Sequence, residues 1–132
     1  MKQSIIIPYY KNKQELLFSL NLLHKYLPKD VEVIIVANNP NTDEIDISFE
    51  DYIVLKFPCA LLYSKAANIG VKYASGDIIT LLDQDIFVTN NWYESLLNKL
   101  LSDSNIGAVS SKMINPTNNR ILEYGIEYTP YN

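Results

Sequence analysis

The chain has 132 residues, of which 48% are hydrophobic and 20% are charged, and its formal net charge at pH 7 is -4. This length supports one sizeable core, so we expect a single domain over residues 1–132. An acidic chain without a Lys/Arg cluster is a poor nucleic-acid binder, because that binding depends on neutralising phosphates. Cys59 stands alone, which excludes an intrachain disulfide, and we expect it to be a small buried hydrophobe. No apolar run is long enough for a signal peptide or a membrane span, and the expected location is the cytoplasm.

Short apolar runs alternate with amphipathic segments along the chain. Unbroken β-branched runs are typical of strands buried on both faces, and leucines recurring every three or four residues are typical of helices. In chain order these patterns predict a strand over residues 5–7 that Pro8 ends, a helix over 13–26, strands over 31–36 and 53–55, a helix over 63–74, a strand over 78–82, a helix from about residue 92 that Asn90 or Asn91 caps, a strand over 106–109 and a hairpin-like tail over 121–128.

Strands separated by helices of this length predict an α/β fold with a mostly parallel sheet that helices flank on both faces. In such sheets ligands bind outside the carboxyl ends of the strands, where the connections reverse direction. This rule selects the loops over residues 8–11, 37–42 and 83–88. It also places Tyr9, Tyr10 and Tyr63 near the expected pocket.

Asp83 and Asp85 are the leading candidates for chemistry, since they directly follow the apolar run over residues 78–82. Mg²⁺ or Mn²⁺ is commonly held by one or two carboxylates together with substrate phosphates. The bare Asp-x-Asp pattern is weak, and its structural alternative is a turn in which an aspartate accepts backbone N–H bonds. The position at the end of a buried strand favours the metal site.

Several segments, in this order and spacing, resemble family 2 glycosyltransferases, including rhamnosyltransferase-like bacterial members. The opening apolar run into Pro8 matches the start of that family, and an Asn-x-Gly helix, an Ala-x-Gly turn and a strand ending in Asp-x-Asp match its central block. These segments are Ser4–Tyr10, Lys65–Gly70, Ala74–Asp77, Leu81–Asp85 and Ile121–Gly125.

The resemblance implies a GT-A-type, Rossmann-like fold and transfer of a sugar from a nucleotide diphosphate donor, with inversion, to a glycan or lipid-linked acceptor. It also implies peripheral contact with the inner membrane face. By the same resemblance, Pro8 and Tyr9 line the nucleobase pocket. Lys65 and Asn68 lie near the nucleotide and its diphosphate. Asp83 approaches the ribose or the metal, and Asp85 is a direct metal ligand, with Mg²⁺ or Mn²⁺ as the cofactor.

Two departures from the family pattern affect these expectations. The family usually places an Asp after the second strand to recognise the nucleobase, but Ala37 stands at that position here. Asn38, the next residue, can offer amide hydrogen bonds instead. The chain is also shorter than the family's complete domain, so we expect an incomplete, donor-binding part and assign no catalytic base.

Two other functions are alternatives to the transferase. An aspartate-nucleophile phosphatase also carries Asp-x-Asp after a strand, but there the motif follows the first strand and a Thr stands two residues beyond the second Asp. Here Phe87 occupies that place. A non-catalytic module that binds a nucleotide sugar stays open, because a truncated transferase would behave in this way. Trp92 is expected to pack its helix, with a sugar contact as the alternative.

Overall fold

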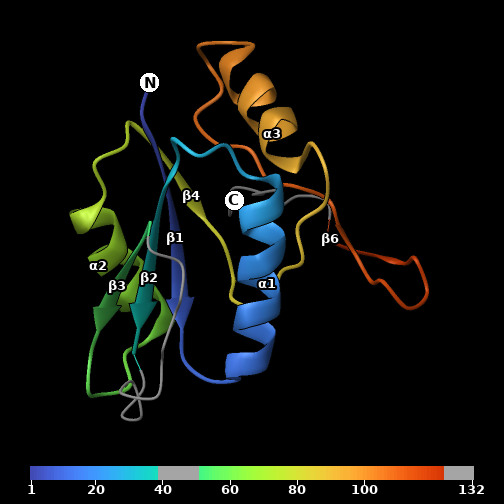
Figure 1. Cartoon of the computed structure of the whole chain (residues 1–132). Helices are drawn as coiled ribbons and strands as arrows, with labels where there is room; N and C mark the ends of the chain where they lie inside the picture. The colour runs from blue at the N-terminus through green and yellow to red at the C-terminus, as the bar shows by residue number, and fades with distance from the viewer. Residues whose placement is uncertain (39–50, 124–132) are drawn as a thin grey trace, which may run out of the picture. The chain divides into compact units, whose positions relative to one another are not determined.

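The computed structural model describes residues 1–38 and 51–123. The chain divides into two compact units, Met1–Thr89 and Asn90–Asn132. In the first unit the elements are β1 (Gln3–Tyr9), α1 (Lys13–Tyr26), β2 (Glu32–Ala37), β3 (Tyr52–Lys56), α2 (Tyr63–Tyr73) and β4 (Ile78–Leu81). The four strands form one sheet in the order β3-β2-β1-β4, and every neighbouring pair is parallel (Figure 1). The predicted α/β class with a mostly parallel sheet is therefore confirmed.

The central strands are buried because helices cover both faces of the sheet. Ile6, Ile34 and Val36 form a fully buried cluster with Ala66 of α2, so their side chains face that helix. Side chains alternate between the two faces of a strand, and Ile5 and Ile7 therefore point the other way. On that face lies α1 (Figure 1), whose buried residues are Leu16, Ser19, Leu20 and Leu23. This alternation explains why β1 and β2 read as unbroken apolar runs.

Gly70 lets α2 lie close against β1 and β2. A Cβ atom added at this glycine would lie 2.2 Å from Cγ2 of Ile6 and 3.2 Å from Cγ2 of Val36. Carbon atoms in contact are normally about 3.5–4.0 Å apart, so a side chain here has no room. The glycine of the Asn-x-Gly segment is thus explained by packing against the sheet.

The sequence pattern predicts that Pro8 ends the first strand. This prediction is wrong, because β1 continues to Tyr9. In a parallel sheet successive residues bond alternately to the strands on either side. The Ile6 carbonyl accepts from Leu82 N on the β4 side, and the Tyr9 carbonyl accepts from Asn38 N on the β2 side. The Pro8 nitrogen therefore faces the β4 side, where the register with β4 ends at the pair Ile6–Leu81. A proline is tolerated there because no partner needs its missing N–H.

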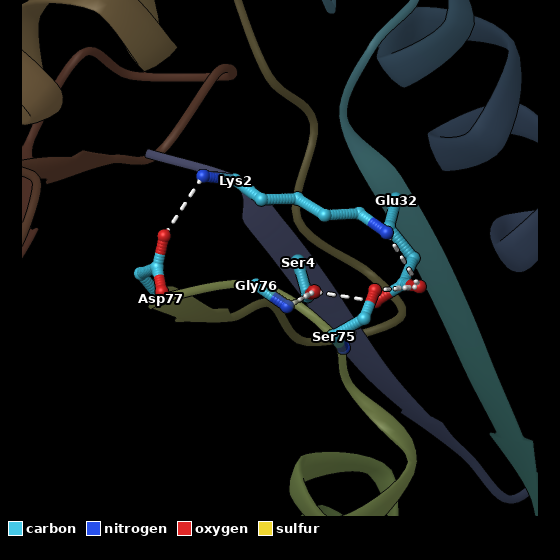
Figure 2. Close-up of polar contacts among 6 residues, drawn as sticks. All are labelled: Lys2, Ser4, Glu32, Ser75, Gly76 and Asp77. Carbon is cyan, nitrogen blue, oxygen red and sulfur yellow. Dashed lines mark hydrogen bonds and ion pairs between the residues drawn. The ribbon is translucent and has the colours of Figure 1, made fainter.

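A polar cluster joins β1, β2 and the turn before β4 at the amino ends of the strands (Figure 2). A carboxylate oxygen of Glu32 accepts a 2.5 Å hydrogen bond from the Ser4 hydroxyl, and Ser75 donates to Glu32 through its N–H at 3.0 Å and its hydroxyl at 2.6 Å. Gly76 N donates to Ser4 Oγ at 3.0 Å, and the Lys2 ammonium lies 3.9 Å from Glu32. Partial burial opposes ionisation of Glu32, but these donors and the lysine outweigh it and lower its pKa.

The second unit contains α3 (Trp92–Leu101) and two short antiparallel strands, β5 (Met113–Ile114) and β6 (Ile121–Glu123). Asn91 is the residue before α3, as predicted, but its side chain makes no capping hydrogen bond. The rings of Trp92 and Tyr93 meet edge to face, 5.6 Å between centroids, and Tyr93 is buried. The predicted strand over residues 106–109 is wrong, because that stretch forms no ladder. Of the predicted tail, residues 124–128 lie outside the described residues.

Cys59 is exposed rather than buried, which corrects the expectation from its residue type. It follows Pro58 in the connection between β3 and α2, and its neighbours Pro58 and Ala60 are exposed as well. None of the described helices is both long and apolar enough to cross a membrane.

Candidate functional site

The carboxyl ends of the four parallel strands meet at one edge of the sheet. From β1 the chain passes through α1 to β2 on one side, whereas β4 lies on the other side of β1. This reversal of direction makes the gap between the ends of β1 and β4 the topological switch point, where open α/β sheets bind ligands. The loops after β1 and β4, over residues 10–12 and 82–89, both start at this point.

Asp83 and Asp85 lie in the loop after β4, and both are exposed. The loop is held at two places. Leu82 N donates to the Ile6 carbonyl at 3.0 Å, and the Ser19 hydroxyl of α1 donates to the Ile86 carbonyl at 2.7 Å. The two carboxylates therefore stand on a short segment that is anchored to β1 on one side and to α1 on the other.

Tyr63, the first residue of α2, donates a hydrogen bond from its hydroxyl to the Asp83 carboxylate. Partial burial raises the pKa of Tyr63 to about 12, and the hydrogen bond to Asp83 and the negative charge of that carboxylate add to the shift. The tyrosine therefore stays a neutral donor at physiological pH. This contact shows that Tyr63 lies beside Asp83, on the side of the sheet where topology predicted it.

The side chain of Gln84 joins the two loops at the switch point. Its Oε1 accepts from Tyr10 N at 2.9 Å, and its Nε2 donates to the Lys11 carbonyl. The sequence did not indicate this residue, because the Asp-x-Asp pattern treats it only as the spacer between two aspartates. A signal was nevertheless present, since an amide side chain can donate and accept at once.

The residues expected at the nucleobase lie on the neighbouring strands. Pro8 and Tyr9 are buried at the end of β1, and Asn38 follows β2 with 3% of its surface exposed. Asn38 N donates to the Tyr9 carbonyl at 2.9 Å, so the structure brings these two residues together. The Asn38 side-chain oxygen Oδ1 is buried and has no hydrogen-bond partner among the described residues. Residues 39–42 of this predicted loop lie outside the described residues.

Lys65 and Asn68 both belong to α2 and are exposed. Lys65 is in the first turn, two residues beyond Tyr63, on the same helix end that contacts Asp83. Within residues 1–38 and 51–123, Lys65 forms no ion pair with Asp83 or Asp85. The structure thus places Lys65 in the first turn of α2 without joining it to either aspartate, and Asn68 lies about a turn further along the helix.

The donor chemistry of the loop suits a divalent cation that a substrate helps to hold. No three His, Cys, Asp or Glu side chains converge into a metal-binding group in the part of the chain that the structure describes. Mg²⁺ typically keeps several non-protein ligands and uses one or two carboxylates plus phosphates. Two exposed carboxylates, Asp83 and Asp85, meet that requirement, whereas they would not form a closed structural metal site.

Comparisons with known proteins agree with this architecture. The profile of the family described as Glycosyl transferase family 2 matches residues 4–131. The Minor teichoic acid biosynthesis protein GgaB of Bacillus subtilis (strain 168) is 28% identical over 104 residues, which are 72% of this chain and 11% of GgaB. The crystal structure of S. aureus TarS 1-349 matches with a TM-score of 0.66 at 22% identity, over 76% of this chain and 32% of that one. A second crystal structure of S. aureus TarS gives a TM-score of 0.62 at 22% identity, over 76% of this chain and 19% of that one.

The likeness to TarS shows the fold, in which a parallel sheet flanked by helices corresponds to the GT-A type. The chain spans 11% of GgaB and 32% of TarS 1-349, so it corresponds to a part of each. Because the family profile covers nearly the whole chain, from residue 4 to residue 131, the chain belongs to glycosyltransferase family 2.

Proposed function

We propose that residues 1–132 are the donor-binding part of an inverting glycosyltransferase that holds a nucleotide diphosphate sugar at the carboxyl edge of the sheet. One observation supports this most strongly. Asp83 and Asp85 stand on an anchored loop at the switch point, exposed, with a neutral tyrosine hydroxyl donating to Asp83. A cation that is also bound by the phosphate oxygens of a nucleotide diphosphate needs few ligands from the protein, and this loop offers two carboxylates.

A divalent cation bound there, Mg²⁺ or Mn²⁺, would neutralise the charge that grows on the nucleoside diphosphate as the sugar leaves. Asp85 and Asp83 would hold it by their carboxylates. The Tyr63 hydroxyl orients Asp83 by occupying one of its lone pairs, which leaves the others for the ligand. Lys65, in the first turn of the same helix, would bring a positive charge toward the diphosphate, and Asn68 would lie near the nucleotide.

Pro8, Tyr9 and Asn38 would form the nucleobase side of the site. The buried Oδ1 of Asn38 supports this, because a buried acceptor without a donor costs about 1–3 kcal/mol until something donates to it. An N–H group of the base is such a donor. Ala37 cannot replace the usual aspartate, so recognition by an amide at the next residue is the simplest arrangement.

The relative named for minor teichoic acid biosynthesis suggests a cell-surface polysaccharide as the product class. We therefore propose a glycan or lipid-linked acceptor, reached by peripheral contact with the cytoplasmic face of the membrane. No residue of this chain is proposed as the catalytic base. A base and an acceptor site would be needed for turnover.

The proposal is tested by calorimetric titration of the chain with UDP and dTDP, each with Mn²⁺, with Mg²⁺ and with EDTA. We expect binding that requires the cation. Asp85→Asn should abolish most of the gain in affinity that the cation provides, because it replaces a charged ligand by a neutral amide. We expect a loss of about tenfold or more in affinity for the cation-bound nucleotide, comparable to the loss of one interaction with a charged group. Asp30→Asn is the matched control, because Asp30 is exposed just before β2, at the amino end of the sheet.

Failure of both nucleotides to bind in the presence of Mn²⁺ would refute the proposal. An equal loss of affinity in Asp30→Asn and Asp85→Asn would show a general charge effect rather than a ligand. A hydrolysis assay with several nucleotide sugars then separates an active transferase from a module that binds without turnover.

A further inference from the structure

The carboxamide of Gln84 makes two main-chain hydrogen bonds to a segment more than seventy residues away. It accepts from Tyr10 N at 2.9 Å and donates to the carbonyl of Lys11, the next residue. The side chain therefore offers one acceptor and one donor to the main chain of two consecutive residues. Gln84 is half-buried, whereas Asp83 and Asp85 on either side of it are exposed.

This link lies just beyond the end of the backbone ladder between β1 and β4. The register ends at Ile6–Leu81, followed by the bond from Leu82 N to the Ile6 carbonyl. Pro8, the next residue of β1 that faces β4, has no N–H to donate. Beyond that point the loop after β1 and the loop after β4 are joined by the Gln84 side chain in place of main-chain bonds.

We propose that Gln84 is a positioning residue that fixes the metal-binding segment relative to the loop after β1. Because Gln84 is covalently flanked by Asp83 and Asp85, anchoring its side chain to Tyr10 and Lys11 restrains the backbone that carries both carboxylates. The inference rests on the proposed function, in which one loop binds the cation and the other lies beside the nucleobase. The restraint then holds these two sides of the donor site in one arrangement. Without this link the two loops could shift independently, and the cation and the nucleobase would be bound less cooperatively.

The test compares the unaltered chain with Gln84→Met and Gln14→Met. Methionine keeps the length and neutrality of the glutamine side chain and removes both hydrogen bonds. Gln14 is exposed in the first turn of α1, so its substitution is the matched control. Three quantities are measured: the hydrogen-exchange rate of the Tyr10 amide by NMR, the melting temperature without ligand, and the factor by which Mn²⁺ increases the affinity for UDP.

In Gln84→Met we expect Tyr10 to exchange about fivefold faster, which corresponds to one lost hydrogen bond of about 1 kcal/mol. We expect the Mn²⁺-dependent gain in UDP affinity to fall by about five- to tenfold, with UDP affinity in EDTA unchanged. Gln84→Glu keeps an oxygen for Tyr10 N and should restore the slow exchange. Gln14→Met should match the unaltered chain in all three measurements.

Unchanged Tyr10 exchange in Gln84→Met would overturn the link between the loops. Equal losses of UDP affinity with and without Mn²⁺, together with a lower melting temperature, would overturn the positioning role and leave a structural one. If the unaltered chain shows no Mn²⁺-dependent binding of either UDP or dTDP, the proposed function fails, and the Tyr10 exchange then decides the loop link by itself.

Discussion

Substitution of Gly70 by alanine tests how closely α2 approaches the sheet. The new Cβ would lie 2.2 Å from Cγ2 of Ile6, a side chain with 0% exposure in the middle of the central strand. Overpacking of this kind costs about 1–3 kcal/mol. Replacing glycine by alanine inside a helix returns up to about 1 kcal/mol. Because an approach of 2.2 Å selects the upper end of the overpacking range, we expect Gly70→Ala to lower the free energy of unfolding by about 2 kcal/mol.

The assay is urea denaturation followed by circular dichroism, with Gly107→Ala as the matched control. A Cβ at Gly107 would meet nothing within 4 Å, so this substitution should leave stability within about 0.5 kcal/mol of the unaltered chain. A melting temperature lowered on the order of 5 °C in Gly70→Ala alone would accompany the loss.

A double-mutant cycle identifies the atom responsible. Ile6→Ala removes Cγ2 and is itself destabilising by about 2–5 kcal/mol, because it leaves a cavity. In that background the added methyl of Gly70→Ala enters free space and should be neutral or stabilising, giving a coupling of about 1–3 kcal/mol. The reasoning would be refuted by a Gly70→Ala variant as stable as Gly107→Ala, or by an equal cost in both backgrounds.

Two further predictions concern the polar cluster and the site. Glu32 has a lowered pKa, so its contribution to stability is complete above the ordinary value of 4.5 and is lost as the pH falls through the lower pKa of the folded state. Glu32→Gln should therefore cost about 1–3 kcal/mol at pH 7, and urea denaturation at pH 3 should show a smaller difference; a gap that widens in acid would contradict this sign. Tyr63→Phe removes the donor to Asp83 and should weaken Mn²⁺-dependent UDP binding about three- to tenfold by calorimetry. Tyr73→Phe, at the exposed far end of the same helix, should have no effect, and equal losses in both variants would argue against the contact.

Most of the architecture of the first unit could be predicted from the sequence, because its local signals and its tertiary environment agree. The helix over residues 13–26 has the predicted bounds, since Asn12 caps it by accepting from Glu15 N and the leucine stripe faces the sheet. The apolar run over residues 106–109 failed as a strand because a β-branched run predicts a strand only where another strand is available to pair with it. The prediction for Pro8 is wrong for a related reason. A proline can lie within a strand when its nitrogen faces a side without a hydrogen-bond partner, and which side that is depends on the sheet rather than on the local sequence.

The candidate site was predictable as a place but not as a set of contacts. Parallel strands bring their carboxyl ends together, so topology alone brought Tyr63 close to Asp83. The contacts of Gln84 arise because the register between β1 and β4 ends before Pro8. The point at which a register ends cannot be deduced from the spacing of residues within one loop. Cys59 was misplaced because its exposure depends on the path of a connection between elements rather than on its residue type.

Pro8 has a consequence for how this fold can diverge. The missing N–H of Pro8 removes one main-chain bond between β1 and β4, and beyond the end of their register the Gln84 side chain joins the loops that follow the two strands. The main-chain hydrogen bonds between strands change only when a whole strand shifts, whereas a side-chain hydrogen bond can be removed by a single substitution. Under the proposed function, a substitution at residue 84 would change the spacing between the two loops that flank the donor, while the sheet beneath stays as it is.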